Sequence, residues 1–85
     1  MKIVYTKHAL EKFAHPDIKK FNLREKDIER AFENPDYHGI DPLRKVEFIL
    51  KKIDSEHILR VIYKVQSSII TIITFYPSAE GRYEK

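Results

Sequence analysis

The segment from Ile58 to Tyr76 constrains the fold more than any other part of the chain. It is dominated by β-branched and aromatic residues, contains neither Gly nor Pro, and is interrupted near its middle by Ser67 and Ser68. This pattern is typical of two β-strands joined by a short turn. With the two serines as the loop, we predict an antiparallel hairpin in which Tyr63 faces Ile72 across the strands.

The alternating residues from Leu43 to Ile53 predict a third strand that runs antiparallel to this hairpin. Asp54 to His57 is expected to form the connecting turn. A loop of two or four residues would bring Ile53 opposite Ile58 in either case. The resulting register gives the sheet one apolar face, which contains Val46, Phe48, Leu50, Leu59, Val61, Tyr63, Val65, Ile70 and Ile72.

Two helices are predicted before this sheet. Thr6 is a good N-cap for a helix that begins at Lys7, and Pro16 disfavours helical geometry at His15. Before this helix, the segment 3–5 is a candidate for a short additional strand.

The second helix is expected to begin after Asn22, with Glu25 completing a capping box, and to end at Asn34–Pro35. Each helix carries an apolar stripe that needs covering. We therefore predict a single α+β domain over residues 1–85, with two N-terminal helices packed on one face of a three- to four-stranded antiparallel sheet.

Composition excludes several classes of protein. A chain of 85 residues has room for one core, and the absence of cysteine excludes disulfides, thiolate zinc sites and thiol catalysis. The apolar runs are too short to cross a membrane, so we expect a cytoplasmic protein without membrane partners. No histidine pair has the helical spacing of a metal site, and no phosphate-binding glycine loop is present, so we expect no metal and no cofactor.

The predicted register places Lys51 beside Arg60 on the face away from the helices, with Phe75 next in the same row. Two like charges facing each other destabilise a sheet, and a phosphate group would remove that cost. Phe75 would offer a surface on which a base could stack. A solvated pair of cations is the alternative, because long side chains reach water at little cost.

Two more rows cross the same predicted face. One pairs Glu47 with Lys64, and the other is an uncovered isoleucine row made of Ile49, Ile62 and Ile73. An exposed apolar row of this kind is expected to contact a partner, such as a second copy of the chain.

Several short motifs resemble one known family. They are the Y-T-K-H-A-L-E-K segment of residues 5–12, E-N-P-D at 33–36, L-R-V-I-Y at 59–63, and I-I-T-F-Y-P at 72–77 with an Arg-Tyr pair at 82–83. Together they cover nearly the whole chain. The chain resembles a family classed as a domain of unknown function, in a branch of the RelE/ParE toxin superfamily near the BrnT toxins.

The resemblance implies the toxin of a toxin–antitoxin pair, an endoribonuclease that cuts mRNA without a metal, often on the ribosome, and is neutralised by a cognate antitoxin. By the same resemblance, Arg60 and Arg82 would stabilise the developing charge, and Lys51 would assist them. Tyr83, His57 or a lysine would transfer protons, and the residues alone do not decide among them.

The remaining candidates are substrate-binding residues. Lys64 and Phe75 are placed by the predicted register on the open face, where they would hold RNA. His8 and Lys12 belong to the recurring N-terminal element of the resemblance, and helix capping and packing is the favoured explanation of His8. The alternative to an enzyme is a non-catalytic binding or interaction domain of the same fold, which would contact a protein target, nucleic acid or a second copy of itself.

Overall fold

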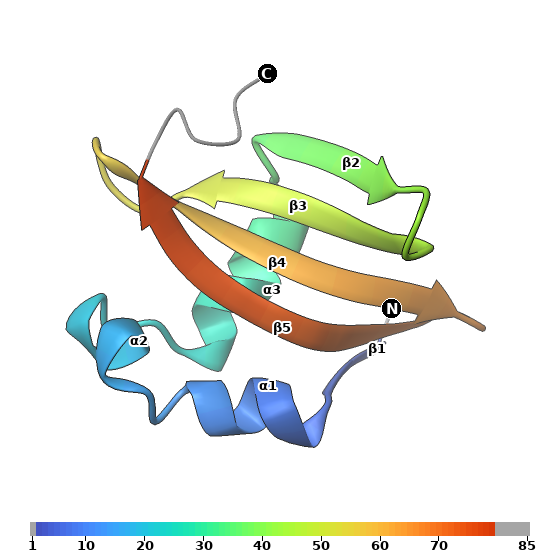
Figure 1. Ribbon diagram of the computed structural model, residues 1–85, viewed down its shortest axis with the longest axis horizontal. Helices are drawn as coiled ribbons and strands as arrows, with labels where there is room; N and C mark the ends of the chain where they lie inside the picture. The colour runs from blue at the N-terminus through green and yellow to red at the C-terminus, as the bar shows by residue number, and fades with distance from the viewer. Residues whose placement is uncertain (1, 80–85) are drawn as a thin grey trace.

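The computed structural model describes residues 2–79, which form one sheet and three short helices. The elements in chain order are β1 (Lys2–Tyr5), α1 (Lys7–Lys12), α2 (Pro16–Lys20), α3 (Glu25–Glu33), β2 (Tyr37–Asp41), β3 (Val46–Lys52), β4 (His57–Gln66) and β5 (Ile69–Ala79). The strand order is β1-β5-β4-β3-β2 (Figure 1).

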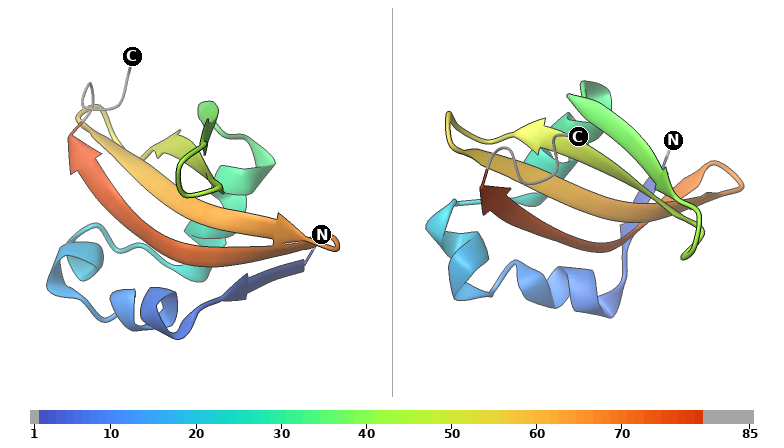
Figure 2. Two further views of the ribbon diagram at one scale, coloured as in Figure 1. Left: turned by 45° about the vertical axis from the view of Figure 1, so that its right-hand side comes forward. Right: turned by 45° about the horizontal axis from the view of Figure 1, so that its top comes forward.

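The α+β class and the packing of helices on one face of a sheet are confirmed (Figure 2). Three details of the prediction are corrected. Residues 2–79 contain three helices, not two, because the segment Pro16–Lys20 between the two predicted helices forms α2. Within residues 2–79 the sheet has five strands, not three or four, and it is mixed, because β1 pairs with β5 in parallel. The amide of Thr6 continues this pairing by donating to the carbonyl of Ile72 at 3.0 Å.

Local signals set most helix ends. The Thr6 hydroxyl caps α1 by accepting a hydrogen bond from the Ala9 amide at 3.1 Å, as predicted. Pro16 occupies the first position of α2 and His15 is its N-cap, so the expected break before Pro16 is confirmed.

The predicted cap of the last helix is wrong. Asn22 has a positive φ of 54° and ends the turn after α2. Arg24 is the N-cap of α3, and its amide donates to the carboxylate of Asp27 at 2.8 Å. The end of this helix at Asn34 is confirmed.

The serine turn of the hairpin is confirmed, and both of its residues are strained. Ser67 and Ser68 have φ values of 49° and 66°, in the left-handed region that favours asparagine and glycine. We therefore predict that the double substitution Ser67→Asn, Ser68→Gly stabilises the protein by about 1 kcal/mol and raises its melting temperature by roughly 4–8 °C. Calorimetry would check this, and an unchanged or lower melting temperature would contradict it.

The predicted pairing of β3 with β4 is wrong by one residue. Ile53 donates its amide to the carbonyl of His57 at 3.0 Å, so three residues, Asp54 to Glu56, lie between them. Loops of two or four residues would have given the expected register. An odd loop moves every β3 side chain to the other face, because side chains alternate along a strand.

This shift reverses the two faces of β3. Ile49 lies in the core beneath the helices, whereas Val46 and Leu50 are buried on the opposite face. Ile49 therefore does not belong to an uncovered isoleucine row. That predicted row does not exist, because Ile49 pairs with Val61 and not with Ile62.

The hairpin of β4 and β5 follows the predicted register only near its turn. The pairs from Gln66–Ile69 to Tyr63–Ile72 are confirmed, but the register then shifts and Ile62 faces Thr74. Ile73 is the extra residue of this β-bulge, and its carbonyl accepts a hydrogen bond from the Thr6 hydroxyl at 3.1 Å. The cap of α1 thus also stabilises the irregular point of β5.

Beyond the bulge, Phe75 turns towards the helices. It pairs with Val61, is fully buried, and lies 4.7 Å from the ring of Phe13 between ring centroids. The other core residues beneath the helices are Ala9, Ile18, Leu23, Ile28, Ala31, Ile49, Leu59, Val61, Tyr63, Ile70 and Ile72. Within residues 2–79, no helix is long and apolar enough to span a membrane.

Candidate active site

The predicted pair of cations on the sheet does not exist. Lys51 faces Leu59 and Arg60 faces Leu50, so the two side chains lie on opposite faces. The Lys51 ammonium donates to the carbonyl of Asn34 at 2.7 Å, at the negative end of α3. The prediction that Lys51 and Arg60 jointly bind one phosphate on the open face is therefore wrong.

Arg60 itself lies away from the helices. Its guanidinium carbon is 4.1 Å from the ring centroid of Phe48, a cation–π contact. Phe48 in turn lies against Gly39, where a Cβ atom would come within 2.4 Å of the phenylalanine ring. This stacking fixes Arg60 over β3.

The other predicted residues are dispersed. Phe75 is buried in the core and offers no stacking surface, so its predicted contact with a base is wrong. Lys64 is exposed on the face of Arg60, roughly 13 Å further along the strand. His8 is exposed on α1, and Arg82 and Tyr83 lie outside the described residues.

Two of the predicted residues, Lys12 and His57, lie together in a cleft of about 350 Å³. Its lining residues come from the α1–α2 segment and from the end of the sheet where β4 begins and β5 ends. Figure 1 shows these segments on the same side of the molecule. The residues that line the cleft are Lys12, His15, Asp17, Ile18, Lys20, Phe21, His57, Tyr76 and Pro77.

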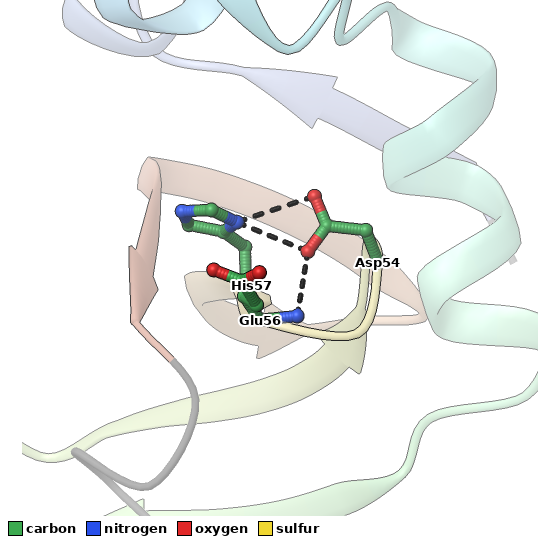
Figure 3. Close-up of polar contacts among 3 residues, drawn as sticks. All are labelled: Asp54, Glu56 and His57. Carbon is green, nitrogen blue, oxygen red and sulfur yellow. Dashed lines mark hydrogen bonds and ion pairs between the residues drawn. The ribbon is translucent and has the colours of Figure 1, made fainter.

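His57 is held by a carboxylate in the β3–β4 turn (Figure 3). Its Nδ1 atom lies 3.0 Å and 3.2 Å from the two carboxylate oxygens of Asp54. The Glu56 amide donates to the same carboxylate at 2.8 Å. The hydrogen bonds from Glu56 and His57 lower the pKa of the Asp54 carboxyl, which keeps it ionised at neutral pH.

This pairing determines what His57 can do. An ionised carboxylate at Nδ1 holds the ring proton there and leaves the lone pair on Nε2, which points away from Asp54. The edge-on contact with Phe21, with 4.7 Å between ring centroids, further restricts the ring. His57 is thus oriented to accept a proton through Nε2.

Lys12 supplies a partly buried cation. Its ammonium donates to the hydroxyl of Thr74 at 3.3 Å and lies 5.2 Å from the ring centroid of Tyr76. Burial lowers the pKa of Lys12, because removing the ammonium from water disfavours its charged form. An anion in the cleft would stabilise this charge.

His15 and Lys20 come from α2. The Nδ1 atom of His15 accepts a hydrogen bond from the Asp17 amide at 3.2 Å, so a neutral His15 ring carries its proton on Nε2. Lys20 follows in the last turn of the same helix. The cleft therefore combines one imidazole arranged to accept a proton, the neutral imidazole of His15, the carboxylate of Asp17 and two ammonium groups.

His15, Lys20 and Tyr76 were not predicted as site residues. Only His15 carried a local signal, since it precedes Pro16 and was expected at a break in the helix. Nothing in the sequence indicated that α2 packs beside the start of β4. Within residues 2–79, no three histidine, aspartate or glutamate side chains cluster closely enough to hold a metal ion.

No protein-family model, curated protein or solved structure matches the chain.

Proposed function

We propose that the protein is a metal-independent endoribonuclease of mRNA, the toxin of a toxin–antitoxin pair, and that the cleft around His57 is its active site. One observation carries the proposal. His57, oriented by the ionised Asp54, lies in a cleft whose cations include the partly buried Lys12. A proton acceptor beside cations is what cleavage of a phosphodiester by its own ribose hydroxyl requires.

The proposed reaction assigns each group a role. Nε2 of His57 takes the proton from the 2′-hydroxyl, whose oxygen attacks the adjacent phosphorus. Lys12 and Lys20 balance the charge that develops on the phosphate oxygens. As the P–O5′ bond breaks, the ammonium of Lys12, whose pKa is lowered by burial, donates a proton to the leaving oxygen. The products are a 2′,3′-cyclic phosphate and a 5′-hydroxyl.

This proposal differs from the one based on the resemblance. His57 and Lys12 are retained, while Lys51 and Arg60 are no longer assigned to a shared phosphate. Arg82 and Tyr83 remain candidates from the resemblance alone, since they lie outside the described residues.

The proposal is tested by incubating the purified full chain with mRNA in EDTA, with and without ribosomes. We expect cuts whose 5′ fragments end in a cyclic phosphate, and none in a substrate carrying a 2′-deoxy residue at the cut position. Intact RNA under both conditions would overturn the nuclease assignment.

A second candidate is an interaction domain, and exposure at one sheet edge favours it. Ile40 in β2 is 64% exposed, and Leu43 in the following turn is 93% exposed. The edge strand β2 also has backbone groups available for pairing. An antitoxin or a second copy of the chain would fit here. Charged substitutions of Ile40 and Leu43 that abolish complex formation without affecting RNA cleavage would support this role.

A further inference from the structure

A second cleft, of about 440 Å³, adjoins the proposed active site. It lies between the α2–α3 connection, α3 and the end of β3, elements that pack together. Its lining side chains include Phe21, Arg24, Lys26, Arg30, Lys51 and Lys52. We call it the basic cleft.

The basic cleft concentrates charge far beyond the average for this chain. Five of its lining side chains are cationic, and Asp27 is its single acidic one. The Asp27 carboxylate already accepts a hydrogen bond from the Arg24 amide at 2.8 Å. The lining therefore has an excess of four positive charges, whereas the whole chain has a net charge of +3.

Repulsion between these positive charges destabilises α3. Lys26 and Arg30 are four residues apart on the helix, a spacing at which like charges destabilise by some tenths of a kcal/mol. Both also line the same cleft as Lys51 from β3. Within residues 2–79, no ion pair involves any of these three side chains.

The three glutamates of α3 lie elsewhere, and Glu25 lines a hollow on another side of the helix. Glu29 and Glu33 line a separate hollow together with Phe32. The glutamates of α3 thus lie apart from Lys26 and Arg30, which line the basic cleft. A polyanion bound between α3 and β3 would relieve the repulsion among these cations and meet no carboxylate other than Asp27.

Phe21 connects this cleft with the proposed active site. It lines both clefts, and its ring contacts His57 edge-on. The two clefts are thus neighbours, and their lysines and arginines flank Phe21 on both sides. Adjacent phosphates of one nucleic-acid strand could occupy the two clefts together.

We propose that the basic cleft binds the sugar-phosphate backbone of a single-stranded RNA next to the bond that is cut, an inference that rests on the proposed nuclease function. Lysine and arginine side chains contact phosphates without reading the base, so binding here is independent of sequence. The cleft positions the strand, and His57 in the neighbouring cleft performs the chemistry.

The test measures binding separately from cleavage. A fluorescently labelled 2′-O-methyl oligoribonucleotide lacks the attacking hydroxyl, so its binding can be followed by anisotropy without being cut. The test variant is Lys26→Gln with Arg30→Gln. Its matched control is Lys2→Gln with Arg44→Gln, which removes the same charge at two exposed positions outside both clefts.

Each phosphate contact contributes about −0.7 to the slope of log K against log salt concentration for a single strand. We expect the test variant to lose about 1.4 from the magnitude of this slope and to bind about 20-fold more weakly at 0.1 M salt. The control should bind like the wild-type protein. A variant that exchanges the two cations, Lys26→Arg with Arg30→Lys, keeps both charges and should bind with the wild-type affinity.

The outcomes separate the two proposals. If the test variant keeps the wild-type affinity and slope, or if the control loses as much, the basic cleft is not the strand-binding site and the nuclease assignment is unaffected. If the test variant shows the expected loss of affinity and slope but the wild-type protein never cuts cleavable RNA, the nuclease assignment fails and the binding site is supported. Absence of any RNA binding by the wild-type protein would overturn both.

Discussion

Replacing His57 with alanine is expected to slow RNA cleavage about 10²- to 10⁴-fold, the usual contribution of a positioned general base. The side chain lost is the one whose Nε2 atom accepts the proton of the attacking hydroxyl. RNA binding should change little, because the phosphate contacts come from lysines and arginines. Single-turnover cleavage of a labelled mRNA in EDTA measures the rate, and anisotropy with the 2′-O-methyl oligoribonucleotide measures the binding.

The chain offers a matched control in His38. This histidine also pairs with a carboxylate, since its Nε2 atom lies 2.8 Å from Glu47, but it is in β2, outside the cleft. His38→Ala should therefore cut RNA at the wild-type rate. Equal rates for His57→Ala and the wild-type protein would remove His57 from the mechanism. A folded His57→Ala protein, checked by circular dichroism, is needed because His57 also contacts Phe21.

Asp54→Asn tests the orienting role separately. The neutral asparagine amide lacks the negative charge that holds the Nδ1 proton of His57. The rate of RNA cleavage should therefore fall, but by less than in His57→Ala. A loss larger than that of His57→Ala would mean that Asp54 acts in another way.

The parts of the fold that the sequence predicts are those set by neighbouring residues. The Ser67–Ser68 turn, the cap at Thr6 and the break before Pro16 each depend on a few consecutive residues. They are all found where their local chemistry places them.

The errors in the predicted strand register have two causes, a small difference in loop length and a contact between distant parts of the chain. The three-residue loop before His57 differs by a single residue from the loops expected there, yet this difference turns β3 over. The bulge at Ile73 is stabilised by the hydroxyl of Thr6, which is 67 positions away in the chain. No pattern within the β5 segment reveals that contact.

The candidate site also combines residues that the sequence suggests with residues that only tertiary packing brings together. Lys12 is a candidate because it lies in a motif that resembles the family, and His57 because the implied reaction needs a group that transfers protons. The two residues line one cleft. Their neighbours His15 and Lys20 depend on how α2 packs beside the sheet, which is a tertiary property. The pairing of Lys51 with Arg60 rested entirely on the register, and it was lost with it.

The two registers make opposite predictions for two phenylalanines. In the structure Phe75 is fully buried and contacts Phe13, whereas Phe48 is partly exposed on the other face. Phe75→Ala should therefore lower the free energy of unfolding by about 3–5 kcal/mol, the cost of losing a buried phenylalanine and leaving a cavity. For a domain of this size the melting temperature would fall by at least about 12 °C.

Phe48→Ala is the matched control, since it removes the same side chain from a neighbouring strand of the sheet. Its cost should be clearly smaller, because part of the ring remains in contact with water and its stacking on Arg60 contributes only about 0.5–2 kcal/mol. Urea unfolding of both variants gives the comparison. The register expected from the alternation of the strands places Phe48 under the helices and Phe75 in the open, so it requires the reverse ranking. A Phe48→Ala protein less stable than Phe75→Ala would therefore contradict the register of the structure and place Lys51 and Arg60 on one face again.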